Sequence, residues 1–145
     1  MTDRSHPPRP AGIVTAAHAQ TPPPPPSRGS LSLVLGRHLL VDFTGCAPAL
    51  LDDLEHVRVS LLEAVRRSGA TIITHVFHQF SPQGITGVVV IAESHVAIHT
   101  WPEHGYAAVD IFTCSPTIRP EPVQECLREA FAAEQSHVAL VERGI

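Results

Sequence analysis

A serine, a histidine, a carboxylate and a thiol lie within a short stretch of this chain. Glu93 precedes Ser94, His99 follows five residues later, and Cys114 closes the stretch. A serine hydroxyl can attack the carbonyl before it and convert the amide to an ester; removal of the Ser94 α-proton and β-elimination would then cut the chain. The new end would carry a pyruvoyl group, a ketone that forms a Schiff base with an amine substrate. His99 is a candidate base because imidazole titrates near neutrality.

Strand geometry sets a condition on this chemistry. Residues five apart on a regular strand point to opposite faces, so Ser94 and His99 can meet only if the chain bends between them, with a bend or bulge near Glu93-Ser94. The alternative is an ordinary serine at a strand end. No Gly-x-Ser-x-Gly elbow surrounds Ser94, which argues against a hydrolase of that type.

The histidines of the same stretch suggest a metal site as a second hypothesis. His95 and His99 would share one face of a strand, and a third ligand could come from His104, His75, His78 or Glu103. None of the spacings matches a metal-binding signature. Hydrogen bonds to backbone or water on a polar sheet face account for most of the ten histidines, and we predict no metal.

Four further residues each allow a structural and a functional interpretation. Cys114 could be a small buried residue, as most free cysteines are, or a thiol acid that protonates carbon. Phe80 and Trp101 could be core aromatics, or rings that stack on a purine or face a cation. Glu103 follows Pro102 at a position that we expect to be exposed, where its carboxylate is either solvated or bonded to ligand hydroxyls.

Size and composition indicate a single globular domain. The chain has 145 residues, of which 43% are hydrophobic and 17% charged. The formal net charge of −4 offers no basic patch for nucleic acid. Three cysteines without a CxxC spacing favour a reducing, cytoplasmic location over a disulfide framework. No apolar run approaches the ~20 residues of a membrane helix, so no membrane association is expected.

The first 29 residues differ in composition from the rest. Pro7, Pro8 and Pro10 are followed by five prolines at 22–26. Such a tract cannot bury enough apolar surface to offset its ordering entropy, so residues 1–29 are predicted to be a disordered extension. Ala17-His18-Ala19 faintly imitates a signal cleavage site, and secretion is a minor alternative.

From Leu33 onward the chain alternates between strand and helix patterns. Residues 39–43 predict a strand. Pro48 suits a first helical turn, and apolar residues follow it at steps of three and four; Arg66 and Arg67 suit the end of the helix, and Gly69 supplies a left-handed stop. The apolar stripe consists of Leu50, Leu54, Val57, Leu61 and Val65.

The remaining elements predict a sheet with one further helix. Segments 71–80, 87–92, 95–100 and 106–114 are rich in β-branched residues, 123–133 is an amphipathic helix, and 138–141 is a last strand. We summarise the order as β-α-β-β-β-α-β. This is an α+β fold, a two-layer sandwich with two helices on one face of a mainly antiparallel sheet. The other face would be uncovered, and a second copy of the chain is its simplest partner.

With these residues identified, the chain resembles the short bacterial and archaeal class of S-adenosylmethionine decarboxylase proenzymes. The resemblance runs from Leu35-Gly36-Arg37-His38-Leu39 to Glu142-Arg143-Gly144. Its densest stretches are Ser68 to Ile72, Phe77-His78-Gln79-Phe80, Gly87 to Ile91 and the block from Glu93 to Cys114. The proline tract has no counterpart in the family pattern.

The resemblance implies a role for each residue of the site. It makes Glu93-Ser94 the self-cleavage bond and Ser94 the precursor of a covalent pyruvoyl cofactor, which holds the substrate as a Schiff base. It makes His99 the residue that transfers a proton during processing, and Cys114 the donor that protonates the substrate carbon. Thr86 stands where relatives often carry a serine near the processing centre. Phe80, Trp101 and Glu103 match positions that line the pocket for adenine, sulfonium and ribose.

The implied activity converts S-adenosylmethionine to carbon dioxide and decarboxylated S-adenosylmethionine, the aminopropyl donor for spermidine. Residues 30–145 would form the decarboxylase domain, cut between 93 and 94 and assembled as a homodimer with sheets facing each other. One alternative is the same pyruvoyl chemistry on another amino acid, such as arginine or ornithine. An alternative of another class is a non-catalytic or metal-binding module that never cleaves.

Overall fold

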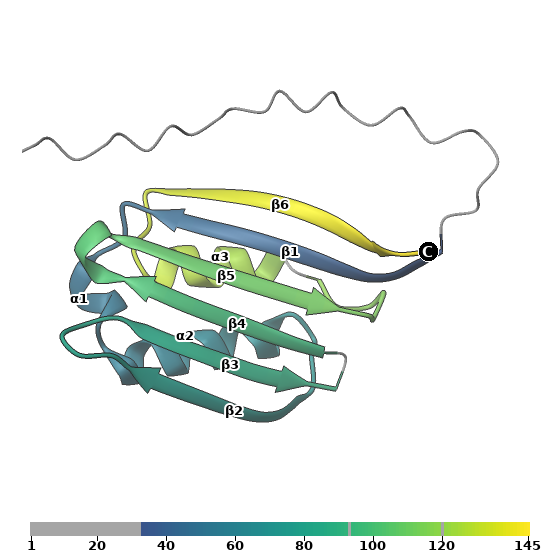
Figure 1. Ribbon diagram of the computed structural model, residues 1–145, viewed down its shortest axis with the longest axis horizontal. Helices are drawn as coiled ribbons and strands as arrows, with labels where there is room; N and C mark the ends of the chain where they lie inside the picture. The colour runs from purple at the N-terminus through teal and green to yellow at the C-terminus, as the bar shows by residue number, and fades with distance from the viewer. Residues whose placement is uncertain (1–32, 93, 120) are drawn as a thin grey trace, which may run out of the picture. The chain divides into compact units, whose positions relative to one another are not determined.

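Six antiparallel strands form one sheet in the order β2-β3-β4-β5-β1-β6 (Figure 1). The computed structural model describes residues 33–92, 94–119 and 121–145. The predicted extension 1–29 and Glu93 therefore lie outside the described residues. The strands are β1 (Val34–Thr44), β2 (Ile72–Gln79), β3 (Ile85–Ile91), β4 (Ser94–Trp101), β5 (Tyr106–Thr113) and β6 (Gln135–Gly144).

The longer helices, α2 (Leu54–Arg67) and α3 (Glu121–Ala130), both lie on one side of this sheet (Figure 1). Val57, Leu61 and Val65 of the predicted apolar stripe are fully buried, because their spacing keeps them on the face of α2 that meets the sheet. Gly69 has φ +86° just beyond α2, as predicted. None of the described helices has the length and apolar character needed to cross a bilayer.

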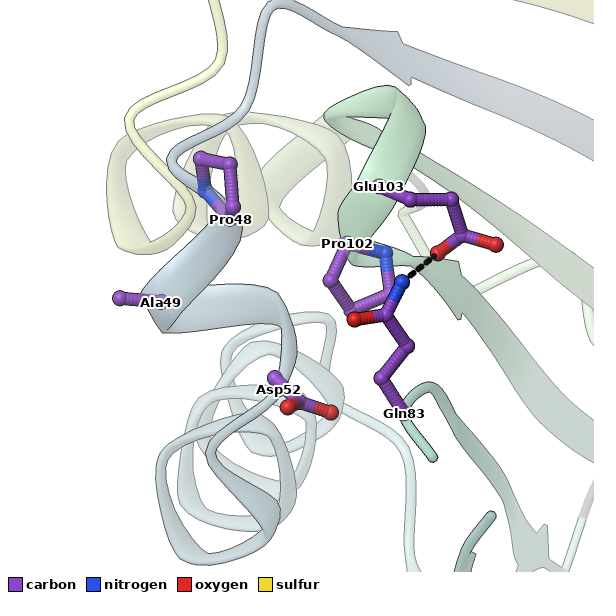
Figure 2. A pocket seen from close by; sticks show the side chains of 6 residues that line it. All are labelled: Pro48, Ala49, Asp52, Gln83, Pro102 and Glu103. Carbon is purple, nitrogen blue, oxygen red and sulfur yellow. Dashed lines mark hydrogen bonds between the residues drawn. The ribbon is translucent and has the colours of Figure 1, made fainter. Parts of the chain in front are cut away.

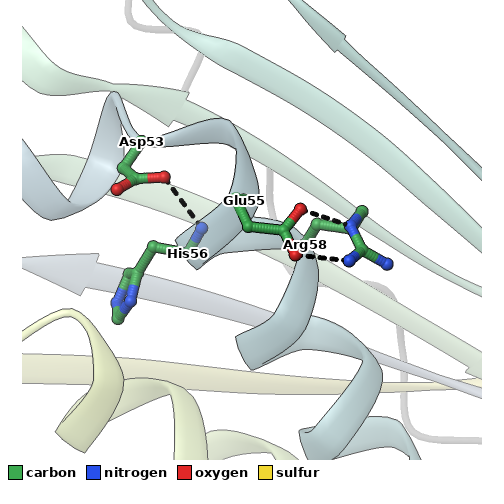
Figure 3. A network of polar contacts seen from close by, with 4 residues as sticks. All are labelled: Asp53, Glu55, His56 and Arg58. Carbon is green, nitrogen blue, oxygen red and sulfur yellow. Dashed lines mark hydrogen bonds and ion pairs between the residues drawn. The ribbon is translucent and has the colours of Figure 1, made fainter.

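The helix predicted from Pro48 onward is divided in two. Pro48 opens a single turn, α1 (Pro48–Leu51), and α2 begins three residues later. The side chain of Asp53 accepts a hydrogen bond of 2.9 Å from the backbone N–H of His56 and caps α2 (Figure 3). The Asp53 carboxylate therefore starts α2 directly after the end of α1 at Asp52, although the apolar spacing continues across the break.

The α+β class and the placement of helices on one face are confirmed. The predicted order β-α-β-β-β-α-β is one strand short, because four strands, β2 to β5, lie between α2 and α3. A short 3-10 turn, η1 (Pro102–His104), separates β4 from β5, which pair as two distinct antiparallel strands.

The second face of the sheet carries no helix among the described residues (Figure 1). We call it the open face. Alternation along the strands places His99 on it, opposite the buried Ile98 and Thr100. Several of its apolar side chains are exposed, namely Leu40, Val76, Val90 and Val141.

Candidate active site

Ser94 is the first residue of β4, where the chain returns from β3. It pairs with Ile91 of β3 and with Thr113 of β5. Its φ of +151° is a torsion that residues other than glycine rarely adopt. Backbone strain of this kind is concentrated at functional sites. The chain is therefore irregular at Ser94, but the bend expected between Ser94 and His99 is absent from the register of β4 with its described neighbours.

Cys114 lies at the same end of the sheet as Ser94. It directly follows Thr113, the cross-strand partner of Ser94, and its side chain is exposed. Ser94 and Cys114 line one pocket together with Ile91, Ala92 and Ser115. We call this pocket the serine end. The structure thus brings together the predicted pyruvoyl precursor and the predicted proton donor.

His99 is not brought to Ser94. The register of β4 with β3 and β5 runs from Ser94 to His99 without a shift, so no bulge shortens the strand between them. Five residues of extended strand span ~16 Å, and strand alternation directs the side chains of Ser94 and His99 to opposite faces of the sheet. The irregular torsion at Ser94 leaves this separation in place, and the two residues of one chain cannot share a proton directly.

Thr86 and His99 form a contact pair of their own. They are opposite one another in the pairing of β3 with β4, and Thr86 Oγ1 lies 2.9 Å from His99 Nδ1. The hydroxyl of Thr86 therefore orients the imidazole ring of His99. The role of Thr86 near the processing centre stays a prediction, and this contact is the geometry that supports it.

The three predicted substrate-binding residues gather around this pair. Phe80, Trp101 and Glu103 line one pocket together with His99. We call it the histidine end. Phe80 is 50% and Trp101 39% exposed, so both rings are open to a ligand and neither is a core aromatic. Their exposure argues against the core interpretation, and a role in ligand binding stays a prediction.

A buried hydroxyl holds the histidine end in position. Thr100 lies between His99 and Trp101; its Oγ1 accepts the N–H of Ile85 at 2.8 Å and donates to the carbonyl of Leu51 at 2.9 Å. The Thr100 side chain is buried, so both bonds are shielded from water. They tie β4 to β3 and to α1, and so fix the strand that carries both functional residues.

Glu103 is held by a neighbour that the sequence did not single out. The side-chain amide of Gln83 donates a hydrogen bond of 2.9 Å to the carboxylate of Glu103 (Figure 2). The two side chains meet at the rim of a hollow that also includes Pro48, Asp52 and Pro102 (Figure 2). One carboxylate oxygen of Glu103 is thus already engaged before any ligand binds.

Tyr106 extends the aromatic side of the histidine end. Its ring centroid lies 5.3 Å from that of Trp101, and its hydroxyl donates a hydrogen bond of 2.6 Å to Asp42. This bond is the main reason that the pKa of Tyr106 rises to about 12, with burial and the Asp42 charge adding to it. The phenol therefore remains neutral at physiological pH and anchors the Trp101 ring on one side.

His95 is a contact of Ser94 that the sequence analysis missed. The Nδ1 atom of His95 lies 3.2 Å from Ser94 Oγ. Neighbouring residues on a regular strand point to opposite faces, so alternation alone argues against this contact. Ser94 is the first residue of β4, where regular alternation only begins, and no pattern in the sequence predicts the contact.

The metal hypothesis has no geometric support in the described part of the chain. Within residues 33–92, 94–119 and 121–145, no three His, Cys, Asp or Glu side chains are close enough to hold an ion. His95 and His99 share the open face, but each is engaged by a hydroxyl, Ser94 in one case and Thr86 in the other.

Comparison with known proteins identifies the family. Residues 37–144 match the family model described as S-adenosylmethionine decarboxylase. The chain belongs to the S-adenosylmethionine decarboxylase family. Curated relatives include the S-adenosylmethionine decarboxylase proenzyme of Thermodesulfovibrio yellowstonii, 51% identical over 111 residues, which cover 77% of this chain and 82% of the relative. The proenzyme of Acidithiobacillus ferrooxidans is 50% identical over 110 residues, covering 76% and 83%.

A solved structure of this family shares the fold. The crystal structure of the adenosylmethionine decarboxylase from Aquifex aeolicus superposes with a TM-score of 0.70 at 38% sequence identity. The match covers 77% of this chain and 92% of that one. Membership of the decarboxylase family thus rests on sequence and on structure.

Proposed function

We propose that the chain is a self-processing S-adenosylmethionine decarboxylase that makes its own pyruvoyl group from Ser94. The observation that carries the proposal is the pocket at the serine end, which holds the strained Ser94 and the exposed thiol of Cys114 together. The match over residues 37–144 supports 30–145 as the decarboxylase domain. The unpaired cysteines, three in the described residues, are in keeping with a location in the cytosol.

The residues at the serine end suit a pyruvoyl group. A pyruvoyl group, once formed, supplies the ketone that binds the substrate amine and accepts electrons when carbon dioxide leaves. Cys114 follows the strand that pairs with Ser94, and its thiol donates a proton to the substrate carbon. The exposure of that thiol lets a substrate reach it, and Ser115 borders the same pocket.

The active unit in this proposal is a dimer. His99 is ~16 Å along β4 from Ser94 of its own chain, so it serves the Ser94 α-proton of another subunit. Stacking two open faces about a twofold axis that runs across the strands puts the serine end of one subunit over the histidine end of its partner. The exposed apolar residues of the open face, Leu40, Val76 and Val90 among them, favour such stacking.

The substrate is assigned by the histidine end. Phe80 and Trp101 offer exposed rings beside His99, which suits the flat adenine and the positive sulfonium. The carboxylate of Glu103 on the same pocket suits ribose hydroxyls. Arginine and ornithine have neither an adenine nor a ribose, so they would leave this wall of the pocket without a partner.

Release of carbon dioxide from carboxyl-labelled amino acids tests this assignment. We expect release from S-adenosylmethionine and little or none from arginine or ornithine. The Ser94→Ala chain, which cannot form a pyruvoyl group, should release none from any of the three. Activity on arginine alone would contradict the substrate, and activity of Ser94→Ala would contradict the mechanism.

A further inference from the structure

We propose that His95 is the catalytic base of the first step of self-cleavage. The inference rests on the proposed function and adds a residue to it. His95 Nδ1 takes the proton from Ser94 Oγ as that oxygen bonds to the carbonyl carbon of residue 93. The same nitrogen gives the proton to the amide nitrogen of Ser94 as its bond to that carbon breaks. The products are an ester and a free amine, with no atom gained or lost.

The contact that carries this inference involves the reacting atom itself. Ser94 Oγ and His95 Nδ1 are 3.2 Å apart, within reach for proton transfer after a small adjustment. The same serine also has an irregular φ of +151°, a torsion on the side of the bond to be cut. Ser94 therefore combines a strained backbone next to that bond with a base in contact with its hydroxyl.

The imidazole of His95 is held in place by its strand neighbours. It is opposite Val90 on β3 and Phe112 on β5, with ring centroids of His95 and Phe112 separated by 5.9 Å. Phe112 also meets the ring of His38 on its far side, at 5.6 Å. The residues directly opposite His95 on both strands are apolar, and its Nδ1 atom contacts Ser94 Oγ.

His99 does not fill the same role within one chain. It lies ~16 Å away along β4, and its Nδ1 atom is engaged by Thr86 Oγ1 at 2.9 Å. The structure thus separates two histidines that could act on Ser94 in sequence. His95 acts on the hydroxyl proton, and His99 of the partner subunit acts later on the α-proton, once the ester exists.

Hydroxylamine distinguishes these two steps because it cuts esters and leaves ordinary amides intact. The chain contains no asparagine, so it has no Asn-Gly bond that hydroxylamine would also attack. Full-length chain is produced by cell-free synthesis, and the fragments 1–93 and 94–145 are followed by mass spectrometry with and without hydroxylamine. His95→Asn and His95→Gln are both made, and circular dichroism verifies that each is folded.

We expect His95→Asn to cleave at least ~100-fold more slowly than wild type, because the amide keeps an acceptor near the Nδ1 position but is not a base. Hydroxylamine should release no fragment from it. His99→Asn should stay uncut alone but release fragment 1–93 with hydroxylamine, because its ester forms and is not eliminated. His38→Asn is the matched control, since His38 contacts the same Phe112 ring, and it should cleave within a few-fold of wild type.

Two results would overturn the inference directly. One is cleavage of a folded His95 variant within a few-fold of the wild-type rate. The other is an ester in that variant that hydroxylamine can cut, since the first step would then proceed without His95. A wild-type chain that is neither cut nor sensitive to hydroxylamine would overturn the proposed function, and this inference with it.

Discussion

At the scale of residues, the torsion of Ser94 connects the fold with the chemistry. A φ of +151° costs free energy in any residue with a side chain, and a fold retains it only where the surroundings impose it. Here Ser94 is paired with Ile91 and Thr113 on both sides, which holds its backbone in place. The strain lies next to the bond that we propose is cut, so cleavage can relieve it.

The position of Cys114 predicts that cleavage and decarboxylation can be separated. Cys114→Ala should still be cut, because the Ser94-His95 contact does not involve the thiol, but it should lose ~100-fold or more of decarboxylation when the proton donor is lost. The measurement is carbon dioxide release per cleaved chain. Cys126→Ala is the control, since Cys126 lies on α3, and a comparable loss in that variant would contradict the role of Cys114.

Tyr106 predicts a pH-dependent contribution to stability. Its pKa rises from the ordinary ~10 to about 12 because it donates a hydrogen bond to Asp42. The folded state binds this proton more tightly, so the contribution is complete below pH ~10 and is lost as the pH rises through about 12. Thermal unfolding should show Tyr106→Phe melting a few degrees below wild type at pH 8.

The difference between the two melting temperatures should shrink as the pH approaches 12. If the difference between the melting temperatures of wild type and Tyr106→Phe stayed constant between pH 8 and about pH 12, the hydrogen bond to Asp42 would not set the pKa of Tyr106.

At the scale of elements, the cap of α2 is the clearest stability prediction. Asp53→Ala removes the acceptor for the His56 N–H and should lower the free energy of unfolding by about 1 kcal/mol. Urea unfolding measures this as a lower midpoint with an unchanged slope. Asp53→Asn should keep most of the free energy of unfolding that Asp53→Ala loses, since asparagine also caps helices. A midpoint equal to wild type for Asp53→Ala would contradict the cap.

Glu55→Ala is the matched control for Asp53→Ala. Glu55 lies two residues further on and forms an exposed ion pair with Arg58 (Figure 3). Exposed pairs of this kind contribute little to stability. The midpoint of Glu55→Ala should therefore stay close to that of wild type.

The elements themselves could largely be predicted from the sequence. The spacing of Val57, Leu61 and Val65 was enough to place a helix, and β-branched runs were enough to place the strands, because burial on one face imposes those periods. The division at Asp53 was not predictable from spacing, since the apolar stripe continues through it. There a single side chain competes for a backbone N–H, and local hydrogen bonding decides the outcome.

The site could be predicted only in part. The resemblance named its residues. Strand alternation correctly predicted that the side chains of Ser94 and His99 do not meet on a regular strand. Two features lay beyond the sequence. The contact of His95 with Ser94 runs against strand alternation, and the grouping of Phe80 with His99 depends on how β2, β3 and β4 pair. Neither a contact of this kind nor a strand register is encoded in the identity of single residues.

At the scale of the whole molecule, the separation of the serine end from the histidine end predicts complementation between two inactive chains. Ser94→Ala keeps Thr86 and His99, whereas His99→Asn keeps Ser94 and Cys114. Each alone should stay uncut. Co-expressed in equal amounts, about half of the His99→Asn chains should pair with a Ser94→Ala chain and be cut. Mass spectrometry identifies which chain is cut, and absence of cleavage in the mixture would contradict the shared site.

The most direct test of the whole account is the mass of the purified wild-type protein. Self-cleavage at Ser94 predicts two chains, residues 1–93 and residues 94–145, with the second beginning in a pyruvoyl group and resistant to N-terminal sequencing. Ser94→Ala under the same conditions should give one intact chain. A wild-type protein that keeps the mass of all 145 residues after prolonged incubation would contradict the account.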